Sequence, residues 1–431
     1  MLLNALYLVL AALALPWVAW RRCSGGRPVA SPWVRFTGGI AAMTRSDARR
    51  IWMHGVSVGE VQLLAGLADE ICSQASAAGR SIECVISSST TTGLDVAARR
   101  FGEDRTFPCP LDFTWAVRRV LDTVRPDMLV LGELELWPNL LAAADALGIP
   151  IVIVNARMSE RSFRGYRRIA PLVRRMLGHT SLVIARSQDD ADRFSALAAP
   201  TVVTAGSMKF DGLRGDRSDP NVLRLARLAG ISDDAVVFVA GSTQAPEERL
   251  ALEAFRDLAD THPRLRLLIV PRHVERAEEI ASLIEATGFS WQRRSRLDAE
   301  GPDPNVRILL VDTTGELGWW WGMAAIAFVG GSLDGKRGGQ NMIEPAAYAA
   351  AVAFGPHTRN FKDEVRLLLE AGAAERVHSG AELTAFVRRC LDDRSFTADR
   401  GRRAAALVAS QRGAKAATAR LILQRLGAPE P

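Results

Sequence analysis

The chain has 431 residues, 48% of them hydrophobic, and a formal net charge of +6 at pH 7. Its length and composition predict two or three domains with large buried cores. The small positive charge suits an anionic substrate or an anionic lipid surface, and we expect no nucleic-acid partner. Its five cysteines form no CxxC pair, which argues against a disulfide framework or a cysteine zinc site and indicates a reducing compartment.

The N-terminal segment, residues 2–20, carries no charged side chain and is followed at once by Arg21, Arg22 and Arg27. A helix of this length spans roughly 28 Å, about one hydrocarbon core. Because the positive charge follows the apolar run, residues 1–22 predict a retained anchor with the rest of the chain in the cytoplasm, rather than a cleaved signal peptide. A helix that lies flat in the membrane interface is the alternative.

Short apolar runs alternate with helical patterns along the rest of the chain. Such runs predict parallel strands buried between helices. Residues 211–221 separate two series of these runs, which predicts a linker between two doubly wound, Rossmann-like α/β domains that face a cleft. The predicted strands are 51–54, 83–86, 127–132, 151–155, 181–185 and 201–206 in the first series, and 236–241, 266–271, 306–311, 325–331 and 350–355 in the second.

Four helical patterns accompany these strands. Residues 60–78 and 139–147 predict helices between strands of the first series, and residues 397–427 predict one Ala- and Arg-rich terminal helix. Residues 155–177 predict a single basic amphipathic helix, which suits an anionic membrane surface; a charged, solvated face is the alternative.

Glu60 follows the strand 51–54 and a glycine-bearing turn, at the point where the next helical pattern begins. In α/β folds the carboxyl ends of the strands form the mouth where ligands bind. Glu60 is therefore a candidate general base. The alternative is that it only complements the positive end of the helix dipole.

Three other stretches of the first series carry polar groups at strand ends. The hydroxyl-rich loop SSSTTTG (87–93) suits sugar or phosphate groups, or forms a turn with a helix cap. Glu133 and Glu135 lie two residues apart, on one face if their strand persists; salt bridges to arginine are the alternative. Lys209 is one of four lysines in the chain, which hints that a compact ammonium is needed there.

In the second series, residues 327–348 read as a strand, a glycine-rich loop and a helix. Gly330 and Gly331 let the backbone approach a ligand closely, so with Ser332 they predict a phosphate site. Glu344 is a candidate for ribose hydroxyls; its spacing from Asn341 also fits a capping pair. The loop matches neither a dinucleotide fingerprint nor a Walker A motif.

Two further strand ends of this series are less specific. Pro271 and Arg272 end the strand 266–271, where an arginine can pair with phosphate; a surface arginine is the alternative. The stretch GSTQAPEE (241–248) forms an anion site or a helix cap that places Glu247 and Glu248 in the first turn. We find no explanation for the run Trp319–Trp321.

Together these motifs resemble the 3-deoxy-D-manno-octulosonic acid (Kdo) transferase family, whose members attach Kdo to lipid A precursors in lipopolysaccharide synthesis. The resemblance runs to about residue 375. It is carried by an ordered set of motifs: HGVSVGE, SSTTTG, ELWPN, NARMSERS, MKFD, GSTQAPEE, PRH, GELG, FVGGSL, GGQNMIEPAAY and FGPHTRNF. In place of the family's usual STHxGEE, this chain has Gln244, Ala245 and Pro246 after its Ser-Thr pair, which leaves the details of that loop open.

The resemblance implies a GT-B arrangement, an inverting glycosyltransferase that uses CMP-Kdo, and no metal or other cofactor. It implies that Glu60 is the general base. Residues 23–208 would form the acceptor domain, and residues 209–431, with the terminal helix, the CMP-Kdo domain. The implied contacts to CMP are Pro271, Arg272, Gly330, Gly331, Ser332, Asn341 and Glu344, and those lining the cleft near the acceptor and the Kdo carboxylate are Ser89, Thr90, Thr91, Glu135 and Lys209.

We therefore expect an enzyme at the inner membrane, with its catalytic domains on the cytoplasmic face, that moves Kdo from CMP-Kdo to a glucosamine hydroxyl of a lipid A precursor. The alternatives are another GT-B enzyme, such as a UDP-dependent transferase or epimerase, and an inactive membrane-tethered binder of anionic lipid. The number of Kdo units added does not follow from the sequence.

Overall fold

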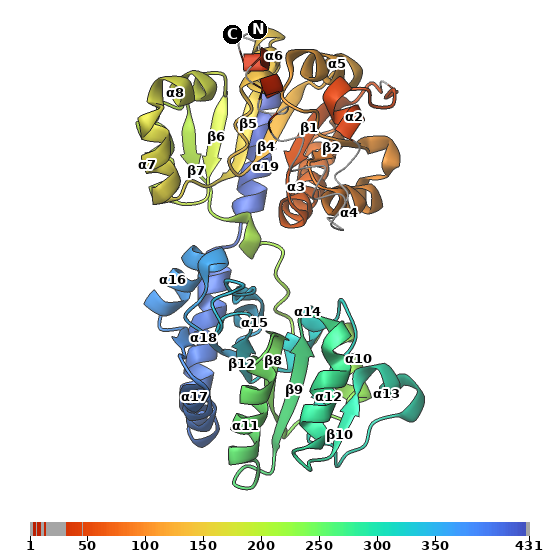
Figure 1. Cartoon of the computed structure of the whole chain (residues 1–431), viewed down its shortest axis with the longest axis vertical. Helices are drawn as coiled ribbons and strands as arrows, with labels where there is room; N and C mark the ends of the chain where they lie inside the picture. The colour runs from red at the N-terminus through yellow and green to blue at the C-terminus, as the bar shows by residue number, and fades with distance from the viewer. Residues whose placement is uncertain (1–2, 6, 10–12, 14–31, 45, 428–431) are drawn as a thin grey trace. The chain divides into compact units, whose positions relative to one another are not determined.

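The computed structural model describes residues 3–5, 7–9, 13, 32–44 and 46–427. The chain divides into two compact units: unit 1 comprises Met1–Gly212 with Arg412–Pro431, and unit 2 comprises Leu213–Gln411. Each unit contains one seven-stranded sheet with helices on both faces (Figure 1). Every strand pairing in both sheets is parallel, so the predicted α/β class with two parallel sheets is confirmed.

The sheet of unit 1 has the order β3-β2-β1-β4-β5-β6-β7. Its central strands are apolar on both faces because helices cover both sides. The strands are β1 (Arg49–Gly55), β2 (Ile82–Ser88), β3 (Thr106–Pro108), β4 (Met128–Gly132), β5 (Ile151–Ala156), β6 (Leu182–Ala185) and β7 (Val202–Thr204). The helices are α2 (Pro32–Thr37), α3 (Val58–Ala77), α4 (Thr91–Phe101), α5 (Thr114–Val124), α6 (Pro138–Ala146), α7 (Glu160–Arg168), α8 (Ala170–Gly178), α9 (Gln188–Ala196) and α19 (Ala414–Gly427).

The sheet of unit 2 has the order β10-β11-β9-β8-β12-β13-β14. Its strands are β8 (Val236–Thr243), β9 (Leu265–Pro271), β10 (Trp291–Arg293), β11 (Ile308–Leu310), β12 (Ile326–Val329), β13 (Ala351–Phe354) and β14 (Ala374–Arg376). Its helices are α10 (Pro220–Leu228), α11 (Glu247–Ala259), α12 (Ala277–Glu285), α13 (Arg294–Glu300), α14 (Leu317–Trp320), α15 (Ile343–Ala347), α16 (Lys362–Glu370), α17 (Gly380–Asp392) and α18 (Arg394–Ser410).

All eleven predicted strands are present, but three others were missed. These are β3, β10 and β14, each of three residues and each at the edge of its sheet. An edge strand of three residues pairs with a neighbouring strand on one side only, and it is too short to show an alternating pattern in the sequence.

Two predicted helices are broken in the structure. In the stretch 155–177, β5 continues to Ala156. α7 and α8 are separate because Pro171, which has no N–H to continue α7, lies in the first turn of a new helix that begins at Ala170. The predicted helix 397–427 is divided into α18 and α19 at Gly413, whose φ of 99° no helix accommodates.

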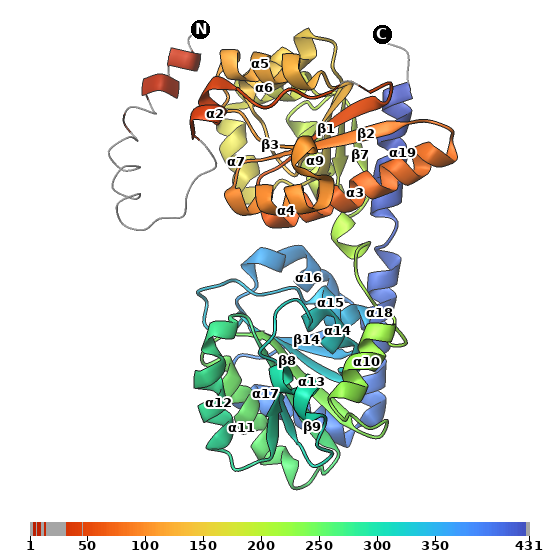
Figure 2. The same ribbon diagram turned by 90° about the vertical axis from the view of Figure 1, so that its right-hand side faces the viewer.

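The terminal helix α19 belongs to unit 1, which differs from the predicted second domain of 209–431. It packs along α3, as Figure 2 shows, and Ile422, Leu423 and Leu426 join the core that α3 lines. The carboxylate of Asp211 accepts hydrogen bonds from the backbone N–H groups of Gly413 and Lys415, the latter at 2.6 Å. Apolar burial and this cap hold α19 against unit 1.

The predicted anchor, residues 1–22, lies mostly outside the described residues. Within the described part of the chain, no helix is long and apolar enough to cross a membrane. Among the few described residues of this segment, the side chain of Asn4 donates to Thr114 Oγ1 at 2.6 Å, and Tyr7 donates to Asp112 Oδ2 at 3.0 Å.

Each sheet has one point where the strand order reverses direction. It lies between β1 and β4 in unit 1 and between β8 and β12 in unit 2. The connections leave such a point toward opposite faces and so open a crevice at the carboxyl ends of the strands, where doubly wound folds bind ligands.

Candidate active site

Glu60 lies in the first turn of α3, directly after β1 at the switch point of unit 1. Its Oε2 accepts from the backbone N–H of Val56 at 2.9 Å, and its Oε1 accepts from the Ser57 hydroxyl at 2.8 Å. The Ser57 Oγ in turn caps the Glu60 N–H at 3.3 Å. The capping role is thus real. A carboxylate has about four acceptor sites, however, so the half-buried Glu60 keeps lone pairs for a ligand proton.

The hydroxyl-rich loop supports the turn that carries Glu60. Ser88 Oγ and Thr90 Oγ1 both donate to the Val56 carbonyl, at 3.1 and 2.9 Å. Thr90 also caps α4 by accepting from Gly93 N–H at 3.1 Å. The predicted cap is therefore present. Of the predicted cleft residues, Thr91 begins α4, and Ser89 has a buried hydroxyl with no hydrogen-bond partner.

Three carboxylates gather at this switch point. β4 ends at Gly132, and Glu133 has a left-handed φ of 54°, so the expectation that Glu133 and Glu135 share a strand face is wrong. Burial raises the pKa of both, and the charge of Glu60 raises each further. The charges of Lys209, Arg157 and Arg186 oppose the shift at Glu133. Glu133 and Glu135 therefore lie close to Glu60, and Lys209 lies close to Glu133.

His54 is a site residue that the sequence did not single out. It lies in β1 and is fully buried, with Nδ1 2.9 Å from Ser87 Oγ and 3.1 Å from the Ser87 carbonyl. Its Nε2 has no hydrogen-bond partner and is 3.9 Å from Glu135 Oε2. Burial lowers the pKa of His54 to about 4, so the ring is neutral at pH 7. The available signals were its place near the end of the first strand and its position as the first residue of the motif HGVSVGE.

The glycine-rich loop at the switch point of unit 2 corrects a prediction. The N–H of Gly330 donates to the Gly241 carbonyl at 2.9 Å, and those of Gly331 and Ser332 donate to Glu247 at 2.7 and 2.9 Å. The Ser332 hydroxyl donates to Val329 O at 2.7 Å and accepts from Gly355 N–H at 2.8 Å. These groups are therefore not free for phosphate, and any contact of the loop with a nucleotide stays a prediction that must use other atoms.

Glu247 organises this loop. It begins α11, as predicted, but its side chain is 1% exposed and accepts four backbone N–H bonds. Besides Gly331 and Ser332, the donors are Gln244 at 2.9 Å and Leu333 at 3.0 Å. The loop with the unusual Gln-Ala-Pro sequence and the glycine-rich loop are thus joined through one carboxylate.

Arg272 and Glu344 are two charged residues near the switch point of unit 2. Pro271 ends β9; the next residue, Arg272, bonds through its backbone N–H to Thr243 O at 3.0 Å and leaves its side chain exposed. Burial raises the pKa of Glu344, and the charges of Arg214 and Arg272 oppose this shift. The exposed guanidinium of Arg272 is therefore near enough to Glu344 for the two charges to interact.

Asn341 Oδ1 accepts from the backbone N–H of Ile343, where α15 begins, at 3.3 Å, so the predicted cap is present. The side-chain amide of Asn341 also donates to Glu344 Oε1 at 3.0 Å, so the two side chains bind each other. The tryptophan run also has an explanation. Trp320 and Trp321 are buried core residues, and Trp319 lies under the Arg214 guanidinium at 4.1 Å.

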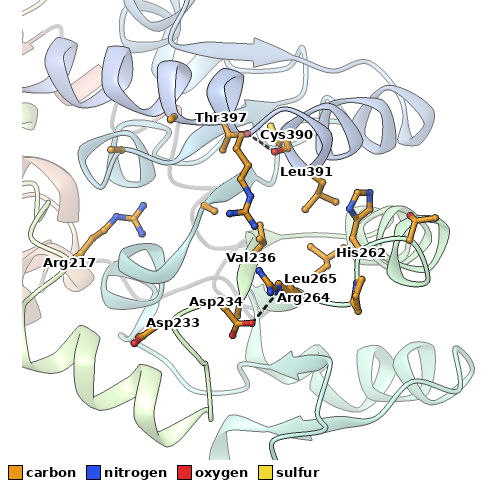
Figure 3. A pocket seen from close by; sticks show the side chains of 17 residues that line it. Arg217, Asp233, Asp234, Val236, His262, Arg264, Leu265, Cys390, Leu391 and Thr397 are labelled. Carbon is orange, nitrogen blue, oxygen red and sulfur yellow. Dashed lines mark hydrogen bonds and ion pairs between the residues drawn. The ribbon is translucent and has the colours of Figure 1, made fainter.

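A cavity of about 630 Å³ lies at the amino ends of β8 and β9, at the end of the unit 2 strands opposite to the switch-point crevice (Figure 3). Arg264 and Asp234, which line it, form an ion pair at 3.2 Å. None of the predicted site residues lines this cavity. In the described ranges, no three His, Cys, Asp or Glu side chains are grouped so as to hold a metal ion.

Comparisons with known proteins decide the family. Residues 34–212 match the family model described as 3-deoxy-D-manno-octulosonic-acid transferase (kdotransferase). A 3-deoxy-D-manno-octulosonic acid transferase of Bordetella pertussis is 34% identical over 379 residues, which cover 85% of this chain and 85% of that protein. The chain belongs to the 3-deoxy-D-manno-octulosonic acid transferase family. It is therefore a glycosyltransferase, as the motifs predicted.

A relative from Haemophilus influenzae with the same name is 33% identical over 335 residues and covers 77% of this chain and 76% of that protein. Among solved structures, the UDP-GlcNAc 2-epimerase from Neisseria meningitidis bound to UDP-GlcNAc has a TM-score of 0.57 at 12% identity, over 88% of this chain and 99% of that chain. At this identity the likeness shows the fold alone.

Proposed function

We propose that this enzyme transfers Kdo from CMP-Kdo to a glucosamine hydroxyl of a lipid A precursor, with Glu60 as the general base. The observation that carries the proposal is the position of Glu60. In a chain of this family, a half-buried carboxylate stands at the switch point of unit 1 with free lone pairs. Catalytic groups of α/β folds lie at such points.

In the proposed reaction, Glu60 takes the proton from the acceptor hydroxyl. The oxygen of that hydroxyl attacks the anomeric carbon of Kdo. The bond from that carbon to the CMP phosphate breaks with inversion, and CMP leaves with the electron pair. General-base help of this kind contributes about 10² to 10⁴ in rate. The Val56 N–H and the Ser57 hydroxyl orient the carboxylate, while Glu135 and Lys209 line the acceptor side near the Kdo carboxylate.

Unit 2 would bind CMP-Kdo. Since the amides of the glycine-rich loop are engaged with Glu247, the exposed guanidinium of Arg272 is the better candidate to neutralise the charge that grows on the departing phosphate. Glu344, held by Asn341, is the candidate for the ribose hydroxyls. We propose a GT-B arrangement in which the two units close on the donor around residues 207–215, without a metal or other cofactor.

We further propose that the enzyme acts at the cytoplasmic face of the inner membrane. The uncharged segment 2–20 and the arginines after it support this location. The exposed arginines of α7 and α8 add a cationic surface that suits anionic lipid; they are Arg161, Arg164, Arg167, Arg168, Arg174 and Arg175.

Mass spectrometry of a lipid A precursor incubated with the protein and CMP-Kdo tests the proposal. We expect the mass of one or more Kdo residues to be added and CMP to be released. Calorimetric titration with CMP and UDP separates the alternative, because a clear preference for UDP would favour a uridine-nucleotide enzyme. Binding of the lipid with no CMP release would indicate an inactive lipid binder.

A further inference from the structure

A chain of buried polar contacts links β1, the strand that leads to Glu60, with the neighbouring strand β2. Trp52 Nε1–H donates to Ser87 Oγ at 2.8 Å, and Ser87 Oγ lies 2.9 Å from His54 Nδ1. Both rings are fully buried. The chain stops at His54 Nε2, a buried atom without a partner. Buried polar groups almost always have a partner, so this atom needs an explanation.

The tautomer of His54 follows from its neighbours. An indole N–H only donates, so Ser87 Oγ accepts from Trp52; it can then donate its own proton to His54 Nδ1 or accept a second bond from Nδ1–H. When Ser87 donates, the neutral ring carries its proton on Nε2. The Ser87 carbonyl, 3.1 Å from Nδ1, would favour the other tautomer. That tautomer, however, would turn the Nε2 lone pair toward the carboxylate of Glu135, and the buried repulsion disfavours it.

Glu135 is the group that Nε2–H faces. The distance of 3.9 Å to Oε2 is too long for a hydrogen bond and too short for a well-formed water bridge. The same oxygen accepts from Trp137 Nε1–H at 2.8 Å. The carboxylate therefore lies between two ring N–H groups and forms a hydrogen bond with only that of Trp137. A small movement of Glu135 completes the second bond.

We propose that His54 is a positioning residue for acceptor recognition: its Nε2–H binds Glu135 when the acceptor sugar enters and fixes that carboxylate to accept a hydrogen bond from an acceptor hydroxyl. This inference rests on the proposed function and adds a residue to it. His54 touches neither substrate. It acts through Glu135, whose carboxylate also accepts from Trp137 Nε1–H.

Two substitutions separate this role from a merely structural one. The amide nitrogen of His54→Gln takes the place of Nε2 and can still donate to Glu135, whereas the amide oxygen of His54→Asn takes the place of Nδ1 and keeps only the Ser87 contact. We expect His54→Asn to raise KM for the lipid acceptor about tenfold, the size typical of a lost hydrogen bond to a charged group. KM for CMP-Kdo should stay unchanged, and His54→Gln should rescue most of the loss.

A double-mutant cycle between His54→Asn and Glu135→Gln completes the kinetic test. We expect the effects on KM for the acceptor to be non-additive, because each change removes the same contact between His54 and Glu135. The matched control is His179→Asn, since His179 also pairs with a carboxylate, Asp145 at 2.7 Å, but on the surface of unit 1. Additive effects, or equal losses for Asn and Gln, would overturn the proposal.

Nitrogen-15 NMR of His54 gives a readout that does not depend on activity. We expect a neutral ring at pH 7 with the proton on Nε2, and a downfield shift of that proton when the lipid acceptor binds. A proton on Nδ1 in the acceptor-bound protein would refute the inference even if Kdo transfer is confirmed. If transfer fails while the tautomer is as expected, the proposed function is at fault instead.

Discussion

The two switch points place an acid at the same position and use it in opposite ways. Glu60 and Glu247 each stand in the first turn of the helix that follows the strand at the switch point, β1 in unit 1 and β8 in unit 2. Glu247 is 1% exposed and accepts four backbone N–H bonds. Glu60 accepts one backbone N–H and one hydroxyl and is half-buried.

This difference shows how to distinguish a structural acid from a catalytic one. A carboxylate whose acceptor sites are filled by amides serves to hold loops together, and none of its lone pairs is free for a substrate proton. A carboxylate that is oriented by two donors but remains accessible can act as a base. Position in the fold is the same for both acids, so the count of donors decides their roles.

Glu60→Gln tests the catalytic role of the acid in unit 1. We expect turnover of Kdo transfer to fall by about 10² to 10⁴, because the amide cannot take the acceptor proton. The melting temperature should change little, since Gln keeps one oxygen to accept at the cap. Turnover assays with thermal melts check this, with Glu70→Gln on the same helix as control. Near-normal turnover of a folded variant would remove Glu60 from its role.

Glu247→Gln should do the reverse. The amide nitrogen would face backbone donors, so we expect a loss of about 3 kcal/mol in the free energy of unfolding, the cost of breaking a buried charged network. Urea unfolding measures it. The control is Glu253→Gln on α11, which should cost less than about 1 kcal/mol. Among the described residues, Glu253 pairs only with the exposed Arg249. Equal stabilities of the two variants would contradict the structural role.

Arg272→Ala tests which part of unit 2 binds the donor. Because the side chain is exposed and has no structural bond in the described part of the protein, we expect unchanged stability and a KM for CMP-Kdo that rises about tenfold or more. Initial-rate kinetics with varied CMP-Kdo give this value. An unchanged KM for CMP-Kdo would show that a group other than Arg272 binds the phosphate.

Ser332→Ala is the matched change in the glycine-rich loop, whose amides and Ser332 hydroxyl form internal hydrogen bonds. It breaks two internal hydrogen bonds and should cost about 1 to 2 kcal/mol in unfolding free energy. KM for CMP-Kdo should stay within about twofold. A large rise in KM without loss of stability would restore the original prediction for this hydroxyl.

The smallest expected effect is a gain of stability in Glu135→Gln. Burial raises the pKa of Glu135 in the folded state, so the stability that its neutral form provides is present at low pH and is lost as the pH rises through that raised pKa. The variant should therefore be more stable than the wild type at pH 7, by about 0.5 to 1 kcal/mol, and equal to it near pH 3. Urea unfolding at both pH values checks this, and a less stable variant at pH 7 would contradict it.

The central strands could be predicted from the sequence because their burial is continuous. The run IVIVN at 151–155 became β5 with a difference of one residue. Three of the four edge strands could not, since three residues such as Thr106–Pro108 leave no periodic signal; only β7 was predicted, from the apolar run at 201–206. The break between α18 and α19 depended on Gly413, which looked like one more small residue in an Ala-rich stretch.

The site was predicted as far as local sequence carries its signal. Glu60 could be found because strand, turn and helix are adjacent in the chain. The role of Glu247 could not, because three of its four donors lie 84 to 86 residues away. His54 was hidden for another reason: a histidine inside an apolar strand looks like a core residue until its neighbours across the sheet are known.

The most direct test of the account is the single-turnover rate of Kdo transfer by Glu60→Gln, measured by rapid quench with both substrates saturating. Such a measurement isolates the chemical step from binding and product release. The account predicts a chemical step at least 100-fold slower than in the wild type, with unchanged affinity for CMP-Kdo. A chemical step as fast as that of the wild type would contradict it.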